Sequence, residues 1–314
     1  MEKIDRETIG ILSQHSNLTE AEVAALLQAN CYTNKALWEK FIRLFLLALG
    51  VGFSVSGVVF FFAYNWDLLS KFVKLSIILL LLITSIAVIL VPKTALLVKK
   101  ISLTAAAILV GVLFAVYGQI YQTGADAYDF FLAWTVFCTL FVIVGDFAPL
   151  WLLYLVLSNT TFGLYMEQAA SDWPKFIILF VFLSFNFSAL ILATYFTKKK
   201  PVVWFLYLLA LATTGLATFG NAMVIYDGYD AYLPLFVGLT LLVYAFVIWQ
   251  GWQTKTSFYL ALIALSCIVL ITTFMIEKMD TDRLFLTLTI FIVLSVTATI
   301  KGLLTLQKKW SNEN

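Results

Sequence analysis

The chain has 314 residues, of which 62% are hydrophobic and 12% are charged, and its formal net charge at pH 7 is +2. Soluble globular domains average roughly 45–50% apolar and about 25% charged residues, so this chain has too few polar side chains to cover a surface exposed to water. The composition excludes a cytosolic enzyme, a nucleic-acid-binding protein and a disulfide-stabilised secreted domain, and it predicts a protein surrounded by lipid.

The first 40 residues are mostly polar and predict a cytoplasmic N-terminal helical segment, residues 1–40. Thr19 and Glu22 have the spacing of a capping box, in which each side chain bonds the other residue's backbone N–H, so a helix is expected to start there. We expect no cleavable signal peptide, because the first apolar run begins only after this segment and is too long for one.

Ten apolar runs follow, each close to the 20 or so residues that a helix needs to cross about 30 Å of hydrocarbon. They predict an all-α, polytopic helical membrane protein with about ten transmembrane helices. The expected spans are residues 43–64, 72–91, 101–121, 128–145, 149–166, 175–196, 202–220, 232–250, 257–276 and 283–303. Together they form a transmembrane helical bundle over residues 41–305, followed by a short cytoplasmic tail, residues 306–314.

Lysine and arginine orient these spans. When the loops are assigned alternately to two sides of the membrane, 15 of the 20 basic residues fall on the side of the N-terminus. Cytoplasmic loops carry an excess of Lys and Arg, so both termini are expected to be cytoplasmic.

The polar groups at mid-depth are amides and hydroxyls, because the spans carry no ionisable side chain there. This argues against proton relays, haem carriers and retinal pumps, and we expect no catalytic residue, no metal site and no cofactor. Asn159 and Asn186 lie at similar depth on neighbouring spans. We expect them to bond each other or a neighbouring helix, and the alternative is that they line a ligand site. Small residues every fourth position predict close helix packing at two ridges: Ala48, Gly52 and Ser56, and Ala107, Gly111 and Ala115.

Two similar tetrads lie 101 residues apart, Asp126-Ala127-Tyr128-Asp129 and Asp227-Gly228-Tyr229-Asp230. They predict a four-helix parallel internal duplication with repeats 101–200 and 202–303. Carboxylates beside tyrosines at the outer face suit a cation, a sugar or a lipid head group. The candidate ligand-binding residues are Asn65, Asp67, Gln119, Tyr121, Asp126, Tyr128, Asp129, Asn221, Tyr226, Asp227, Tyr229 and Asp230. The alternative is that these outer loops are simply hydrated.

The first outer loop contains Asn65-Trp66-Asp67, and two spans later the chain reads Gly118-Gln119-Ile120-Tyr121. With these motifs, roughly residues 1–165 resemble the predicted bacterial membrane proteins of the domain-of-unknown-function 2157 family. The resemblance implies a bacterial inner membrane location and implies no activity. From the residues themselves, Trp66 is expected to lie at the membrane interface, and Asn65 or Asp67 to cap a helix that restarts near Leu68.

Three classes of function stay open. The first is a transporter or a protein that handles a lipid or small molecule through the outer acidic and aromatic cluster. The second is a non-catalytic scaffold or sensor partner that contacts other membrane proteins during envelope assembly. The third is a membrane-embedded enzyme that acts on a lipid-linked substrate. In each class the lipid bilayer is the main partner.

Overall fold

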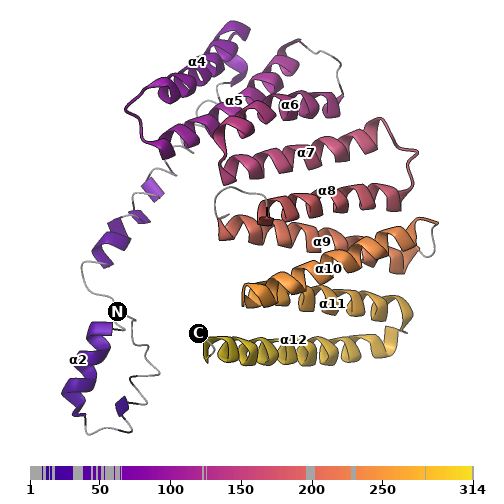
Figure 1. Ribbon diagram of the computed structural model, residues 1–314. Helices are drawn as coiled ribbons and strands as arrows, with labels where there is room; N and C mark the ends of the chain where they lie inside the picture. The colour runs from indigo at the N-terminus through magenta and orange to yellow at the C-terminus, as the bar shows by residue number, and fades with distance from the viewer. Residues whose placement is uncertain are drawn as a thin grey trace. The chain divides into compact units, whose positions relative to one another are not determined.

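In the parts of the chain that it describes, the computed structural model consists of helices joined by turns and loops, with no strand (Figure 1). Those parts are residues 9, 12–13, 15, 18–30, 38–43, 45–46, 49–50, 53, 60, 64, 66–121, 124, 126–195, 202–227, 231–279 and 281–312. The elements are α2 (Glu20–Asn30), the short 3₁₀ helix η1 (Trp66–Leu68), α4 (Lys71–Leu90), α5 (Leu96–Tyr121), α6 (Ala127–Gly145), α7 (Ala148–Gln168), α8 (Lys175–Tyr195), α9 (Val203–Asp227), α10 (Leu233–Gln253), α11 (Ser257–Lys278) and α12 (Thr281–Asn312). The predicted all-α class is confirmed for this part of the chain.

Within the described ranges, eight helices are long and apolar enough to cross a membrane: α4, α5, α6, α8, α9, α10, α11 and α12. The helix at the predicted fifth span, α7, has 21 residues but is not among them. It carries the polar run Ser158–Thr161, which lowers its hydropathy. Most of the predicted span 43–64, and with it the ridge of Ala48, Gly52 and Ser56, lies outside the described residues. These helices identify a multi-span membrane protein in contact with bilayer lipid.

The chain divides into two compact units, Met1–Lys74 and Leu75–Asn314. In the first unit, α2 begins with the predicted capping box. The Thr19 N–H and hydroxyl each donate to Glu22 Oε2 at 2.8 Å, and the Glu22 N–H donates to Thr19 Oγ1 at 3.4 Å. These two carboxylate bonds hold the pKa of Glu22 below its ordinary value. The predicted helix start is confirmed.

The helix cap after the first loop differs from the prediction. The structure begins α4 at Lys71, and the cap is Ser70, whose Oγ accepts the Val73 N–H at 3.4 Å. The expectation that Asp67 caps a helix restarting at Leu68 is wrong, because residues 66–68 form the separate turn η1. Asn65 lies outside the described residues. The Lys74 ammonium lies 5.3 Å from the centre of the Trp66 ring.

The second unit contains two hydrophobic cores. The first joins α5, α6 and α7 through Ala107, Cys138, Val142, Leu150 and Leu157. The second lies among α8, α9, α10 and α11, where α8 packs against α9 and α10 and α9 packs against α11. Among helices that follow one another in the chain from α5 to α12, α7 and α8 have the most widely separated backbones. Leu155 of α7 belongs to the second core, so the two cores meet at α7.

A tryptophan fixes the packing of α5 on α6. The Trp134 indole N–H of α6 donates to the Ala107 carbonyl of α5 at 2.8 Å. Its ring lies over Gly111, where an added Cβ would be 2.1 Å from the indole. Ala107 and Gly111 of the predicted small-residue ridge are therefore at the interface, whereas Ala115 is exposed.

The predicted duplication would pair α5–α8 with α9–α12. The two sets pack differently: α9 lies against α11, and α11 against α12, whereas α5 with α7 and α7 with α8 have no comparable packing among the described residues. The duplication stays a prediction, because the contacts between helices do not repeat from one predicted half to the other.

Candidate functional site

The polar run of α7 meets α8 through a pair of side-chain amides. Asn186 Nδ2 donates to Asn159 Oδ1 at 2.7 Å, and Asn159 Nδ2 donates to Asn186 Oδ1 at 3.3 Å. Each amide also donates to a carbonyl of its own helix, Asn159 to Leu155 at 2.7 Å and Asn186 to Phe182 at 2.9 Å. Asn186 is only 4% exposed. Both N–H groups of each amide are therefore bonded. The pair joins two helices whose backbones are not closely packed.

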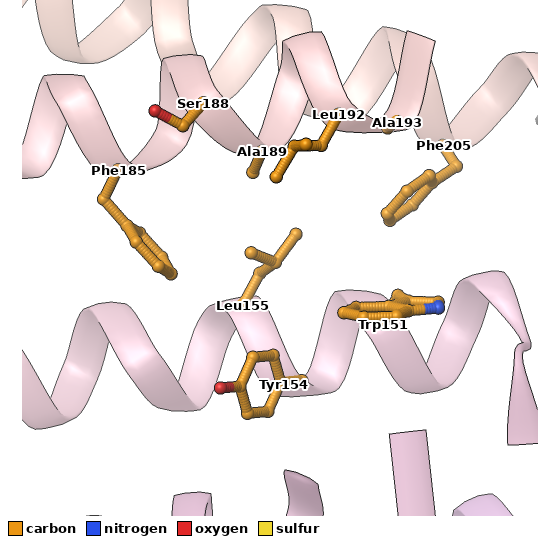
Figure 2. A pocket seen from close by; sticks show the side chains of 9 residues that line it. All are labelled: Trp151, Tyr154, Leu155, Phe185, Ser188, Ala189, Leu192, Ala193 and Phe205. Atoms are coloured by element: carbon orange, nitrogen blue, oxygen red, sulfur yellow. The ribbon is translucent and has the colours of Figure 1, made fainter. Parts of the chain in front are cut away.

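Next to this link, α7 and α8 leave an apolar cavity of about 420 Å³. Figure 2 shows Leu155 projecting from α7 towards Ala189 and Leu192 of α8, with Phe185 on one side and Trp151 on the other. Phe205 of α9 completes the Trp151 end. We call this the α7–α8 cavity. Its volume lies within the range of about 300–1,000 Å³ that is typical of ligand sites.

The α7–α8 cavity offers few polar atoms. Its polar side chains are Trp151, Tyr154 and Ser188. Trp151 is 37% exposed, and within the described parts of the chain its indole N–H has no hydrogen-bond acceptor. The cavity therefore suits a hydrocarbon chain, with one N–H available at one end for a carbonyl or hydroxyl oxygen.

A second, smaller hollow of about 180 Å³ lies beside Asn159 and also lies between α7 and α8. Phe185 lines both hollows and separates them. Phe162 and Phe182, whose ring centroids are 4.7 Å apart, also line the smaller hollow. Asn159 thus borders a mainly apolar space, and its amide is already bonded.

The first half of the predicted outer cluster is partly assembled. Asp126 and Asp129 are exposed and border an open hollow of about 660 Å³ between the ends of α5 and α6, together with Tyr117 and Gly118. The Tyr128 backbone N–H donates to Gln168 Oε1 of α7 at 3.0 Å, and the Tyr128 ring packs on Tyr165. Gln119 and Tyr121 are exposed and do not line this hollow, although the Tyr121 ring lies 4.6 Å from that of Tyr117. Asp67 lies in η1, in the first unit.

The second half of the predicted cluster is only partly described. Asn221 is half-buried, and its Nδ2 donates to Ala217 O at 2.7 Å and to Thr240 Oγ1 of α10 at 3.0 Å. It therefore faces a neighbouring helix. Tyr226 is exposed, the side chain of Asp227 lies outside the described residues, and so do Tyr229 and Asp230. Among the residues whose placement is described, no three His, Cys, Asp or Glu side chains are grouped to hold a metal ion.

Two groups of residues were not predicted from the sequence. One is a hydroxyl cluster that joins α9, α10 and α11: Ser266 bonds Thr218 at 2.5 Å and also bonds Tyr244. The other is the lining of the α7–α8 cavity. The hydroxyls interrupt apolar runs and could have been found from that pattern. The cavity lining carries no such signal, since Leu, Ala and Phe occur throughout these helices.

Comparisons with known proteins bear on the N-terminal half of the chain. No curated protein and no solved structure matches the chain. The predicted family resemblance is confirmed, over a somewhat shorter range than expected. Residues 13–151, which end in the first turn of α7, match the model of the family described as predicted membrane protein (DUF2157).

Proposed function

We propose that this membrane protein binds a lipid or another apolar small molecule in the α7–α8 cavity. The observation that carries the proposal is the cavity itself: about 420 Å³ of mainly apolar space between two helices that span or adjoin lipid. An apolar void loses the dispersion contacts of its lining, so a hydrocarbon chain from the bilayer is a favourable occupant.

The lining also favours an uncharged occupant. Tyr154 is its only ionisable side chain, and a charge placed there would have no partner to offset its desolvation. Lipid tails are as apolar as leucine, so moving a chain from the bilayer into the cavity gains little from hydrophobicity alone. Selectivity would come from shape and from a hydrogen bond to the Trp151 N–H.

A photolabelling experiment tests this proposal. The full chain is reconstituted in vesicles with a fatty acid methyl ester that carries a diazirine on its tail, and labelled peptides are identified by mass spectrometry. We expect labels on Leu155 and its neighbours in α7 and α8. Ala189→Trp fills the cavity and should remove these labels, whereas Ala245→Trp, at an exposed position of α10, should leave them unchanged.

The proposal is overturned if the label is spread evenly over the exposed helix faces. It is also overturned if Ala189→Trp labels as the wild type does. The two Trp variants add the same side chain, so a difference between them reports the cavity and not a general change in hydrophobicity.

We further propose that the protein lies in the bacterial inner membrane with both termini in the cytoplasm. The support is the location of 15 of the 20 Lys and Arg residues on the side of the N-terminus. Reporter fusions that are active only in one compartment test it. Fusions at residue 1 and at residue 314 should both report the cytoplasm, and opposite compartments would refute the orientation.

A further inference from the structure

Three hollows follow one another along α7. Beyond the α7–α8 cavity and the smaller hollow beside Asn159, a third hollow of about 360 Å³ lies between α6 and α7. Ser158 and Phe162 line both this third hollow and the smaller one, and Phe185 lines both the smaller one and the cavity. Each hollow therefore adjoins the next across one or two side chains. We call this series of hollows the α7 track.

The α7 track follows α7 over most of the length of that helix. Its ends are marked by Trp151 in the first turn of α7 and Tyr165 in the last turn. At about 1.5 Å per residue, α7 rises about 21 Å between them. The hydrocarbon core of a bilayer is about 30 Å thick, so this rise equals about two-thirds of that thickness.

Uncharged polar groups lie in the middle of the track. Thr135 of α6 and Thr161 of α7 share a hydrogen bond of 2.9 Å and line the third hollow. Ser158 donates to the Tyr154 carbonyl at 2.8 Å, which leaves its hydroxyl oxygen able to accept. The track contains no Lys, Arg, His, Asp or Glu side chain among its lining residues. It can therefore exchange hydrogen bonds with hydroxyl groups but cannot neutralise a charge.

We propose that the α7 track carries a lipid with an uncharged, hydroxyl-bearing head group from one leaflet to the other. This inference rests on the proposed lipid-binding function and extends it from holding a lipid to moving it. The head group passes the hydroxyls of Ser158, Thr135 and Thr161, while the tail stays in the cavity or in the bilayer. Phe162 and Phe185 separate the hollows, so passage of the head group requires these two side chains to rotate.

The test uses the full chain in vesicles with a neutral glycolipid, a monoglucosyl diacylglycerol, that carries a fluorescent group on its tail. A membrane-impermeant reductant removes the fluorescence of the outer leaflet, and the later loss reports movement from the inner leaflet. The wild type should speed this loss above that of protein-free vesicles. A phosphatidylglycerol with the same label should move no faster than in protein-free vesicles, because its charge has no partner in the track.

Two variants and a control make the test specific. Ser158→Trp obstructs the shared wall of two hollows and should reduce glycolipid movement to the protein-free rate. Phe185→Ala removes a partition and should increase it, and Ala245→Trp should move the glycolipid as the wild type does. The inference is overturned if the wild type matches protein-free vesicles, if Ser158→Trp matches the wild type, or if the charged lipid moves equally fast.

The two proposals can fail separately. Ser158 does not line the α7–α8 cavity, so Ser158→Trp should keep the photolabel near Leu155. Labelling without glycolipid movement would leave lipid binding in place and refute transfer along the track. Absence of both would refute both.

Discussion

Replacing Asn159 with leucine should destabilise the bundle by leaving the amide of Asn186 without its partner on α7. The wild-type pair has one short bond of 2.7 Å and one longer bond of 3.3 Å between the helices. Asn186 is buried, so the variant leaves one of its N–H groups and its carbonyl oxygen unbonded in a water-poor interior. A buried polar group that loses its partner costs about 1–3 kcal/mol.

The double variant Asn159→Leu/Asn186→Leu separates this link from the loss of two polar side chains. When both partners become apolar, no amide is left unsatisfied, so the double variant should cost less than the sum of the two single variants. Polar contacts between membrane helices are worth about 0.6–2 kcal/mol, and we expect a coupling energy in that range.

Reversible unfolding by a denaturing detergent in bicelles measures these free energies. A control cycle combines Asn159→Leu with Thr299→Val, whose hydroxyl bonds Ser295 O within α12. That cycle should be additive within about 0.5 kcal/mol. A coupling energy of zero between Asn159 and Asn186 would refute the interpretation of the pair as a link between α7 and α8.

Two further predictions concern α5 and α2. Gly111→Ala places a methyl group against the Trp134 ring and should lower the free energy of unfolding by about 1–3 kcal/mol. Gly118→Ala places its methyl group in open space and should not lower it. Equal effects of the two variants in the same unfolding assay would contradict the packing of Trp134 on Gly111. Ionised Glu22 supports the start of α2, and its lowered pKa means that this support is complete at neutral pH and is lost as the pH falls below the ordinary value of 4.5. In acid, hydrogen exchange of the Glu22 backbone amide should therefore become faster, relative to that of unstructured amides, in the wild type but not in Glu22→Gln. The same response to acid in both proteins would refute the role of the Glu22 carboxylate in capping α2.

Those parts of the structure that depend on local pattern could be predicted from sequence. The apolar runs predicted the helices from α4 onwards, and the spacing of Thr19 and Glu22 predicted the cap of α2. The similar depth of Asn159 and Asn186 on antiparallel neighbours follows from counting residues from the helix ends. Each of these inferences needs only the rise of a helix and the chemistry of a few side chains.

The α7–α8 cavity could not be predicted in this way, because it depends on which helices approach each other. Leu155 joins the core of α8–α11, while Leu150 and Leu157 of the same helix join the core of α5–α7. All three are leucines in one apolar run. Their different environments arise from the rotation of α7 about its axis, which the continuous hydrophobicity of the run does not define. The role of Trp134 likewise depends on helix packing, because its ring lies against Gly111 of the neighbouring helix.

The most direct measurement is an electron cryomicroscopy map of the full chain in lipid nanodiscs, inspected between α7 and α8. We expect elongated non-protein density between Leu155 and Leu192, reaching towards the Trp151 indole. Close packing of the two helices, with side chains filling this space and no additional density, would contradict lipid binding at the α7–α8 cavity.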